Sequence, residues 1–323
     1  MVKIDLITGF LGSGKTTFIK NYARYLMDHE GKIAILENDY GAINVDMLML
    51  QELQCDKCDL YMVIGGKNDL DCHRRRLHAK LVTLAMLGYH RVIMEPSGIF
   101  DVDELLDMLH EEPLERWYEL GSVISIVDAG LEREMSQNSD YLLMNQVADA
   151  GKIVFSKSQE VTEQEIAETK NHLKRAMEIF RCDRKLSVRD FIIKDWRDLT
   201  DKDYREIMEA GYRLCAHVKL PVTTENQYDS LFYMNVVIKP EEIRSTVERL
   251  IKDETIGHIF RVKGIFKDGE EWIEVNATRD QTTIKKVPEG QEVIIVIGEN
   301  LNQDGIAQYW DFQYGSGRER IDM

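Results

Sequence analysis

A glycine-rich stretch close to the N-terminus constrains the fold more than any other part of this sequence. Residues 9–17 read Gly-Phe-Leu-Gly-Ser-Gly-Lys-Thr-Thr and match the pattern G-x-x-x-x-G-K-[ST]. Residues 3–8 before it predict a short buried strand. Apolar residues after it recur at helical spacing: Phe18, Ile19, Tyr22 and Leu26. A loop of this pattern between a strand and a helix is typical of a nucleotide phosphate site.

The residue types in this stretch suit phosphate binding. Glycines let the backbone turn its N–H groups inward at phosphate oxygens, next to the positive end of the following helix. Lys15 is expected to reach the β- and γ-phosphates, and the Thr16 hydroxyl is expected to hold Mg²⁺. We therefore predict a nucleoside triphosphate site with contacts from Gly9, Gly12, Ser13, Gly14, Lys15, Thr16 and Thr17.

Composition excludes several other classes of function. A chain of 323 residues is long for one core and suggests two domains. The formal net charge of −16 disfavours nucleic acid and anionic membranes as partners, because both would repel it. The sequence has no apolar run of about twenty residues and no room for a signal peptide before its first strand. With five cysteines, an odd number, it is expected to be cytoplasmic with free or metal-bound thiols.

The first half of the chain has the alternating pattern of a parallel α/β fold. Short apolar segments predict strands, and amphipathic helical patterns lie between them; the strands are residues 33–36, 91–94, 123–127 and 152–155. Strands buried on both faces and joined by helices form a doubly wound, mostly parallel sheet with ligands at its carboxyl ends. We assign residues 1–181 to this nucleotide-binding domain, with a last helix at residues 161–180.

The pattern changes toward the C-terminus. Residues 182–224 are polar and mixed, and they are interpreted as a helical connector. A helix with proline at its start is expected at residues 240–251, and Asp268-Gly269 indicates a hairpin turn. Strands are expected at residues 231–238, 259–266, 272–277, 282–286 and 292–298. Residues 225–323 are therefore predicted to form a small α+β domain.

A phosphate loop that supports hydrolysis needs carboxylates at the ends of neighbouring strands, to hold Mg²⁺ or to orient the attacking water. Asp39 follows the second predicted strand, and Glu95 follows the strand at residues 91–94. The alternative is that these residues only cap loops and helices. Gly98 would let a backbone N–H approach the γ-phosphate. We predict catalytic roles for Lys15, Asp39 and Glu95, with Asp39 also on Mg²⁺.

The order of these motifs resembles the CobW-like branch of the CobW/HypB/UreG GTPases. The motifs are the glycine-rich loop, Glu-Asn-Asp-Tyr-Gly at residues 37–41 and Glu-Pro-Ser-Gly at residues 95–98. Val127-Asp128-Ala129 is similar too, and residues 257–264 resemble part of the CobW C-terminal domain. The resemblance implies a P-loop NTPase fold and a GTP-driven switch that delivers or inserts a metal into a client metalloprotein. The oligomeric state, including a homodimer, stays open.

The base-recognition motif departs from the family's pattern. The family has Asn-Lys-x-Asp at the end of a strand, and the matching stretch in this chain is Ser156-Lys157-Ser158-Gln159. The Lys157 stem can still lie along a base, but Gln159 has no charge with which to bind both guanine donors. Losing a charge-assisted pair costs on the order of 1–3 kcal/mol. We predict base contacts from Ser156, Lys157 and Gln159, with GTP favoured and ATP left open.

The metal-binding motif also differs. The family usually carries Cys-x-Cys-Cys after a glycine-rich turn, and the counterpart in this chain is residues 65–73, with Asp69, Asp71, Cys72 and His73. A separate Cys-x-x-Cys is formed by Cys55 and Cys58. Cys55, Cys58, Cys72 and His73 would make a tetrahedral zinc set if the loop folds back. Alternatively, Asp69, Asp71 and Cys72 would make a harder site for iron or manganese. The resemblance leaves zinc, iron, manganese or cobalt open, and ordinary thiols beside a helix N-cap are a third interpretation.

Two other classes of function remain. A phosphotransferase would move the γ-phosphate to a small molecule, with the carboxylates activating an acceptor hydroxyl. A binding switch would hydrolyse little and act through its partners. Phosphate release without an added acceptor separates the first class from a hydrolase.

Overall fold

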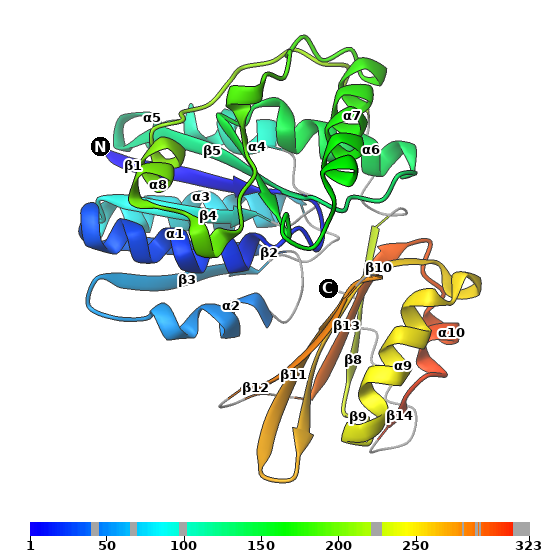
Figure 1. Ribbon diagram of the computed structural model, residues 1–323. Coiled ribbons are helices and arrows are strands. Elements are labelled where there is room, and N and C mark those ends of the chain that lie inside the picture. The colour runs from blue at the N-terminus through cyan, green and yellow to red at the C-terminus, as the bar shows by residue number, and fades with distance from the viewer. Residues whose placement is uncertain are drawn as a thin grey trace. The chain divides into compact units, whose positions relative to one another are not determined.

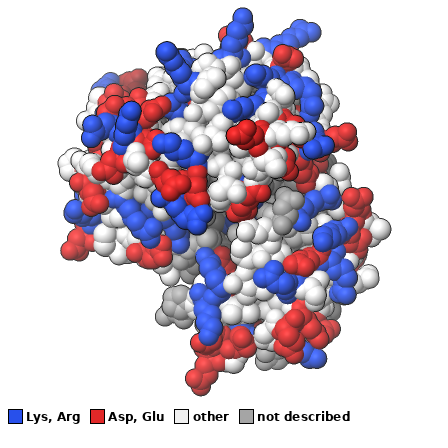
Figure 2. Space-filling model, in the orientation of Figure 1, with Lys and Arg blue, Asp and Glu red and all other residues white. Residues whose placement is uncertain are grey.

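The computed structural model describes residues 1–39, 45–64, 70–96, 102–220, 228–279, 281–287, 290 and 292–312. The chain divides into two compact units, residues 1–222 and residues 223–323. Figure 1 shows the first as a sheet flanked by helices and the second as a separate sheet with its own helices. Acidic and basic side chains are interspersed over the face shown in Figure 2.

A seven-stranded parallel sheet forms the centre of the first unit. Its order is β3-β2-β4-β1-β5-β6-β7, and every pairing is parallel. The strands are β1 (Val2–Thr8), β2 (Ile33–Asp39), β3 (Cys58–Ile64), β4 (Arg91–Pro96), β5 (Tyr118–Asp128), β6 (Lys152–Ser156) and β7 (Phe191–Ile192). Strands in the middle of such a sheet are apolar on both faces, and all six residues of β4 are buried.

Helices cover both faces of this sheet. They are α1 (Lys15–His29), α2 (Val45–Leu50), α3 (Leu70–Met86), α4 (Val102–Leu109), α5 (Leu114–Trp117), α6 (Gln137–Ala148), α7 (Glu163–Ile179) and α8 (Asp201–Met208). The chain moves one way across the sheet from β1 to β3 and the other way from β3 to β7. Because parallel crossovers are right-handed, α1 and α2 lie on one face and α3 to α7 on the other.

The core on the α1 face joins distant parts of the chain. Phe18 and Tyr22 of α1 pack with Ile7 of β1 and Ile126 of β5 in one buried cluster. The same cluster includes residues of α8, and Tyr204 stacks on Tyr25 of α1 with ring centroids 5.2 Å apart. The segment 182–220 thus contributes β7 and α8 to the first unit, together with the short 3₁₀ turns η2 (Val188–Asp190) and η3 (Trp196–Asp198).

The second unit is built on an antiparallel sheet of order β12-β11-β10-β13-β8. Its strands are β8 (Tyr228–Met234), β10 (His258–Asp268), β11 (Glu271–Ala277), β12 (Thr282–Val287) and β13 (Val293–Glu299). Helix α9 (Pro240–Lys252) packs its apolar side, including Val247 and Leu250, into the core of this unit. A small ribbon of β9 (Val236–Val237) and β14 (Asp311–Phe312) and the short α10 (Gln303–Ala307) complete it.

The predicted fold class is confirmed: a doubly wound parallel sheet precedes a small α+β unit. Gly269, with φ of +64°, turns the hairpin between β10 and β11 as the Asp-Gly pair predicted. In the described ranges, helices long and apolar enough to cross a membrane do not occur.

Candidate nucleotide-binding site

The glycine-rich loop joins the carboxyl end of β1 to α1. Gly9, Gly12 and Gly14 have φ of +149°, +80° and +97°, a region that side chains disfavour. A β carbon on Gly9 would lie 2.4 Å from the Ile126 carbonyl oxygen, so the loop runs directly against β5. Gly14 stands at the N-cap of α1 and has no side chain to cap the first N–H groups. These N–H groups therefore face the loop, where an anion binds well.

Lys15 and Thr16 start α1 beneath this loop, and both are buried. The Lys15 ammonium folds back and donates to the Gly9 carbonyl oxygen at 2.9 Å. The Thr16 hydroxyl donates to Glu95 Oε1 at 3.1 Å. Glu95 lies near the end of β4, the strand beside β1, so the sheet brings together three residues that the sequence predicted separately: Lys15, Thr16 and Glu95.

A second carboxylate that sequence analysis did not select lies beside Glu95. Glu37 of β2 is in register with Glu95 of β4, and both side chains are buried. In-register residues on neighbouring parallel strands point to the same face of the sheet. Glu37 is the first residue of the Glu-Asn-Asp-Tyr-Gly motif, and its place in that motif was the signal that could have identified it. The Asp39 side chain and Gly98 lie outside the described residues.

The predicted base-recognition residues follow β6, close to the loop. Ser156 ends β6 and is buried, and a β carbon on Gly14 would lie 3.7 Å from its Cβ. Lys157 has φ of +52° and forms an ion pair with Asp128 at the end of β5. The Gln159 amide donates to Glu160 Oε1 at 3.3 Å. Ser156 thus lies beside the glycine-rich loop, and base recognition by Ser156, Lys157 and Gln159 stays a prediction.

The loop after β7 also reaches this place, which sequence analysis missed. A β carbon on Gly14 would lie 3.3 Å from Cη2 of Trp196. The Trp196 indole donates to the Phe155 carbonyl oxygen at 2.9 Å, which ties the turn η3 to β6. Asp195, the residue before it, caps η3 by accepting from the Arg197 backbone N–H at 2.9 Å. The sequence carries no local signal for this, because the contact depends on β7 joining the sheet beside β6.

The structure does not assemble the predicted zinc set of Cys55, Cys58, Cys72 and His73. Within the described ranges, no three His, Cys, Asp or Glu side chains are grouped so that they could hold a metal ion. Cys55 and Cys58 exchange two backbone hydrogen bonds of 3.0 Å in a tight turn before β3. Cys72 and His73 lie in α3, which begins after the other end of β3. That strand has seven residues, or about 20 Å at about 3.3 Å per residue.

Burial shifts the pKa values of Cys58 and His73 in opposite directions. Burial raises the pKa of the Cys58 thiol to about 12, helped by Cys55 and Asp59, so it stays protonated at neutral pH. Burial lowers the pKa of His73 to about 4, and the nearby Arg76 charge adds to this effect. The imidazole is therefore neutral at pH 7. The alternative ligands Asp69 and Asp71 lie outside the described side chains, whereas Cys72 is described and partly buried.

Comparison with known proteins places this site in a family. The family model described as CobW/HypB/UreG, nucleotide-binding domain, matches residues 3–181. The zinc chaperone YeiR of Escherichia coli is 32% identical over 163 residues, which are 50% of this chain and 48% of that protein. The zinc chaperone YjiA of Escherichia coli is 28% identical over 167 residues, 49% of each chain. The chain therefore spans about half the length of the curated relatives it matches.

Two solved structures also align with much of the chain. The crystal structure of Zn(II)-bound YjiA GTPase from Escherichia coli aligns over 95% of this chain and 97% of that chain, with 18% identity and a TM-score of 0.37. The hydrogenase maturation factor HypB from Archaeoglobus fulgidus aligns over 64% of this chain and 86% of that chain, with 15% identity and a TM-score of 0.37. Since the family model covers more than half of the sequence, the chain belongs to the CobW/HypB/UreG family.

Proposed function

We propose that this protein binds GTP with Mg²⁺, hydrolyses it, and uses the cycle to deliver a transition metal, zinc in the first instance, to a client metalloprotein. One observation carries the nucleotide part of the proposal: Lys15, Thr16 and Glu95 meet under a loop of left-handed glycines at the carboxyl edge of the sheet. Family membership and two relatives named zinc chaperones support the metal part.

Phosphates would bind where the loop and the start of α1 present backbone N–H groups. Lys15 now donates to the Gly9 carbonyl oxygen, and its ammonium would turn from that oxygen to the β- and γ-phosphates. The move exchanges a neutral acceptor for a charged one, which makes a stronger hydrogen bond. Lys15 is thus held ready in the site before the nucleotide arrives.

The residues beside Lys15 fit Mg²⁺. This ion prefers hard oxygen ligands and is usually held by one or two carboxylates together with phosphates and water. The Thr16 hydroxyl, Glu95 and the in-register Glu37 offer that donor set on one face of the sheet. A bound Mg²⁺ would offset the negative charge that develops on the phosphates. Glu95 would also accept a hydrogen bond from the attacking water, which orients it for in-line attack.

Zinc would be the cargo of this cycle, not a resident cofactor. We propose that Cys72, in the first turn of α3, is one of its ligands, together with Asp71 of the same turn and Asp69 of the preceding loop. This loop follows β3, which pairs with β2, and Glu37 and Asp39 belong to β2. A γ-phosphate that orders the end of β2 would therefore change the neighbouring metal ligands.

The experiment follows phosphate release and zinc affinity on one preparation. Wild-type protein should release phosphate from GTP without any added acceptor, and Lys15→Ala should do so about 10²–10³-fold more slowly. Zinc affinity, measured with a chromophoric competitor, should differ between a non-hydrolysable GTP analogue and GDP, and Cys72→Ala should weaken it. Cys55→Ala, an exposed thiol at the opposite end of β3, is the matched control and should bind zinc like wild type.

Two results would overturn the proposal. Phosphate release that needs an acceptor would favour a phosphotransferase. Equal zinc affinity with GTP analogue and GDP would leave an NTPase without the proposed coupling between nucleotide and metal.

A further inference from the structure

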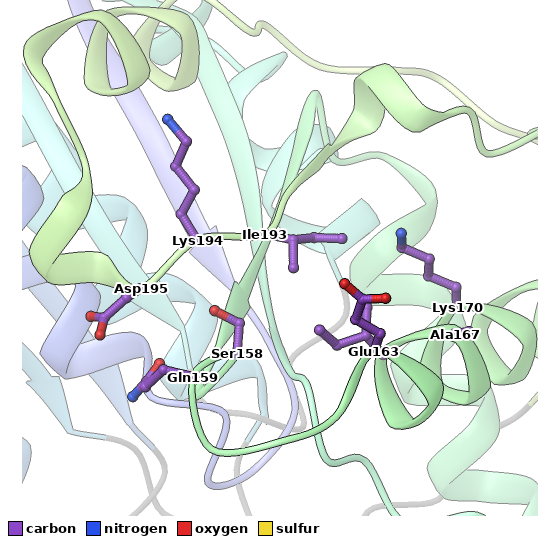
Figure 3. Close-up of a pocket in the computed structure, with 9 residues that line it drawn as sticks. Ser158, Gln159, Glu163, Ala167, Lys170, Ile193, Lys194 and Asp195 are labelled. Atoms are coloured by element: carbon purple, nitrogen blue, oxygen red, sulfur yellow. The ribbon is translucent and has the colours of Figure 1, made fainter.

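A pocket of about 500 Å³ opens beside the glycine-rich loop, between three segments of the first unit. The stretch after β6, the first turns of α7 and the loop after β7 line it: Ser158, Gln159, Glu163, Lys170, Ile193 and Asp195 are among its residues. Figure 3 shows Gln159 and Asp195 together on one side of the pocket, with Glu163 and Lys170 on the other. This volume is ample for a purine base.

The side of the pocket with Gln159 and Asp195 adjoins the phosphate loop. Ser156 and Trp196 both lie within 4 Å of the place that a β carbon on Gly14 would occupy. Gln159 is three residues from Ser156, and Asp195 precedes Trp196. A nucleotide whose phosphates lie in the loop therefore has its base within reach of these two side chains.

Asp195 supplies the negative charge that Gln159 lacks. Hydrogen bonds from the Arg197 side chain, and then from its backbone N–H, lower the pKa of Asp195, so the carboxylate is ionised at neutral pH. The guanine edge offers two donors, N1–H and the 2-amino group, and a carboxylate accepts both. Adenine presents a lone pair at N1, which a carboxylate repels. A carboxylate at this position thus selects guanine.

The present partner of Asp195 can be exchanged. Arg197 contacts both carboxylate oxygens through Nε, at 3.1 and 2.9 Å, but its side chain is 81% exposed. Water can take over the contacts of an exposed guanidinium at little cost. The backbone bond from the Arg197 N–H to Oδ1 keeps the carboxylate in place when the guanidinium leaves.

We propose that Asp195 is the residue that selects guanine in this protein, in place of the aspartate of the Asn-Lys-x-Asp motif. Gln159 lies on the same side of the pocket, and the selecting charge comes from the loop after β7. This inference rests on the proposed function, because it needs a nucleotide whose phosphates lie in the glycine-rich loop.

The test is the nucleotide preference of Asp195→Asn, measured by calorimetry with GTP, ATP and xanthosine triphosphate. Asparagine still caps η3 but carries an amide, which can donate to the xanthine 2-carbonyl group. Wild type should prefer GTP, and Asp195→Asn should shift the ratio of GTP to xanthosine triphosphate affinity by at least about 100-fold toward xanthosine. A gain of xanthosine binding cannot come from a merely structural defect.

Asp198→Asn is the matched control. It removes the same charge from the exposed end of the same turn, outside the pocket, and should leave the ratio unchanged. A wild type that prefers ATP, or an Asp195→Asn variant with the wild-type ratio of GTP to xanthosine triphosphate affinity, overturns the inference alone if GTP binding still depends on Lys15. If wild type binds no nucleotide, the proposed function fails with it.

Discussion

The central sheet buries charged side chains both toward the amino ends of its strands, the amino half, and toward their carboxyl ends, the carboxyl half. The two halves differ in whether these side chains are paired with one another. In the amino half, Asp5 of β1 and Arg91 of β4 form an ion pair at 2.7 Å, and both are almost completely buried. The Tyr22 hydroxyl and the Ser122 backbone N–H also donate to Asp5, at 2.7 and 2.8 Å. Arg91 also contacts Glu30 Oε2 at 3.3 Å, so the buried charges of this half are paired with opposite charges of the chain itself.

In the carboxyl half, buried polar groups gather at the end of the strands. Lys15 donates to a backbone carbonyl, and Glu37 and Glu95 lie side by side on neighbouring strands. Asn38 is 1% exposed, and its side-chain amide makes no hydrogen bond within the described part of the chain. Burying such groups is costly unless they gain partners. We infer that the amino half serves stability and that the carboxyl half is arranged for a ligand.

The largest effect on stability is expected from removing Asp5 from its ion pair with Arg91. Asp5→Ala leaves the buried Arg91 charge with only the partly exposed Glu30 carboxylate at 3.3 Å, which should lower the free energy of unfolding by about 3–5 kcal/mol. Urea unfolding measures this. The double variant Asp5→Leu with Arg91→Met removes both charges and should recover most of the loss. A loss below about 1 kcal/mol in Asp5→Ala would contradict the inference that the amino half serves stability.

The second largest effect is expected on GTP hydrolysis, from a change at the carboxyl edge of the sheet. Lys15→Ala should slow GTP hydrolysis by about 10²–10³-fold, because it removes a positive donor aimed at the phosphates. Its free energy of unfolding should stay within about 1 kcal/mol of wild type. Lys20→Ala, which loses only a partly exposed pair with Glu52, is the control for both measurements. A large loss of stability with unchanged hydrolysis would reverse the roles of the two halves.

A smaller effect separates binding from turnover within the carboxyl half. Glu95→Gln keeps the size of the side chain and removes the charge beside Thr16. Hydrolysis should fall by about 10²-fold, while GDP affinity changes by no more than about threefold. Single-turnover phosphate release and GDP titration give the two numbers. Glu119→Gln, on the exposed side of β5, should match wild type in both.

The smallest effect is a pH dependence of stability from His73. Its pKa is about 4 in the folded chain against 6.5 for the ordinary side chain. Between these values the unfolded chain binds a proton that the folded chain does not. The free energy of unfolding should therefore fall as pH drops from 6.5 toward 4, by on the order of 1–3 kcal/mol. His73→Gln should flatten this slope and His78→Gln should not; equal slopes in both variants would remove His73 as its cause.

Elements that depend on residues close together in the sequence were predicted from the sequence. The glycine-rich loop and β1, β2, β4, β5 and β6 were recognised from spacing and apolar runs, and α7 and α9 lie within about two residues of the expected bounds. Strand β3 was not predicted. Cys55 and Cys58 were interpreted as metal ligands, whereas Cys58 is buried at the start of this strand.

Contacts that depend on topology were not predictable in the same way. Glu37 becomes a partner of Glu95 only through the register of β2 with β4. Asp195 and Trp196 reach the glycine-rich loop only because β7 adds to the sheet beside β6. No spacing within the sequence shows either pairing, since each joins segments more than thirty residues apart. The predicted residues Gly98 and Asp69 stay predictions.

The most direct test of the account is the dependence of GTP-analogue affinity on Mg²⁺. Wild type and Thr16→Val, which keeps the shape of the side chain and removes its hydroxyl, would be titrated with a non-hydrolysable GTP analogue with and without Mg²⁺. If the carboxyl edge holds Mg²⁺ and nucleotide together, Mg²⁺ should strengthen binding at least about tenfold in wild type and less than about twofold in Thr16→Val. The same gain in both proteins, or none in wild type, would contradict the assignment of this edge as the nucleotide site.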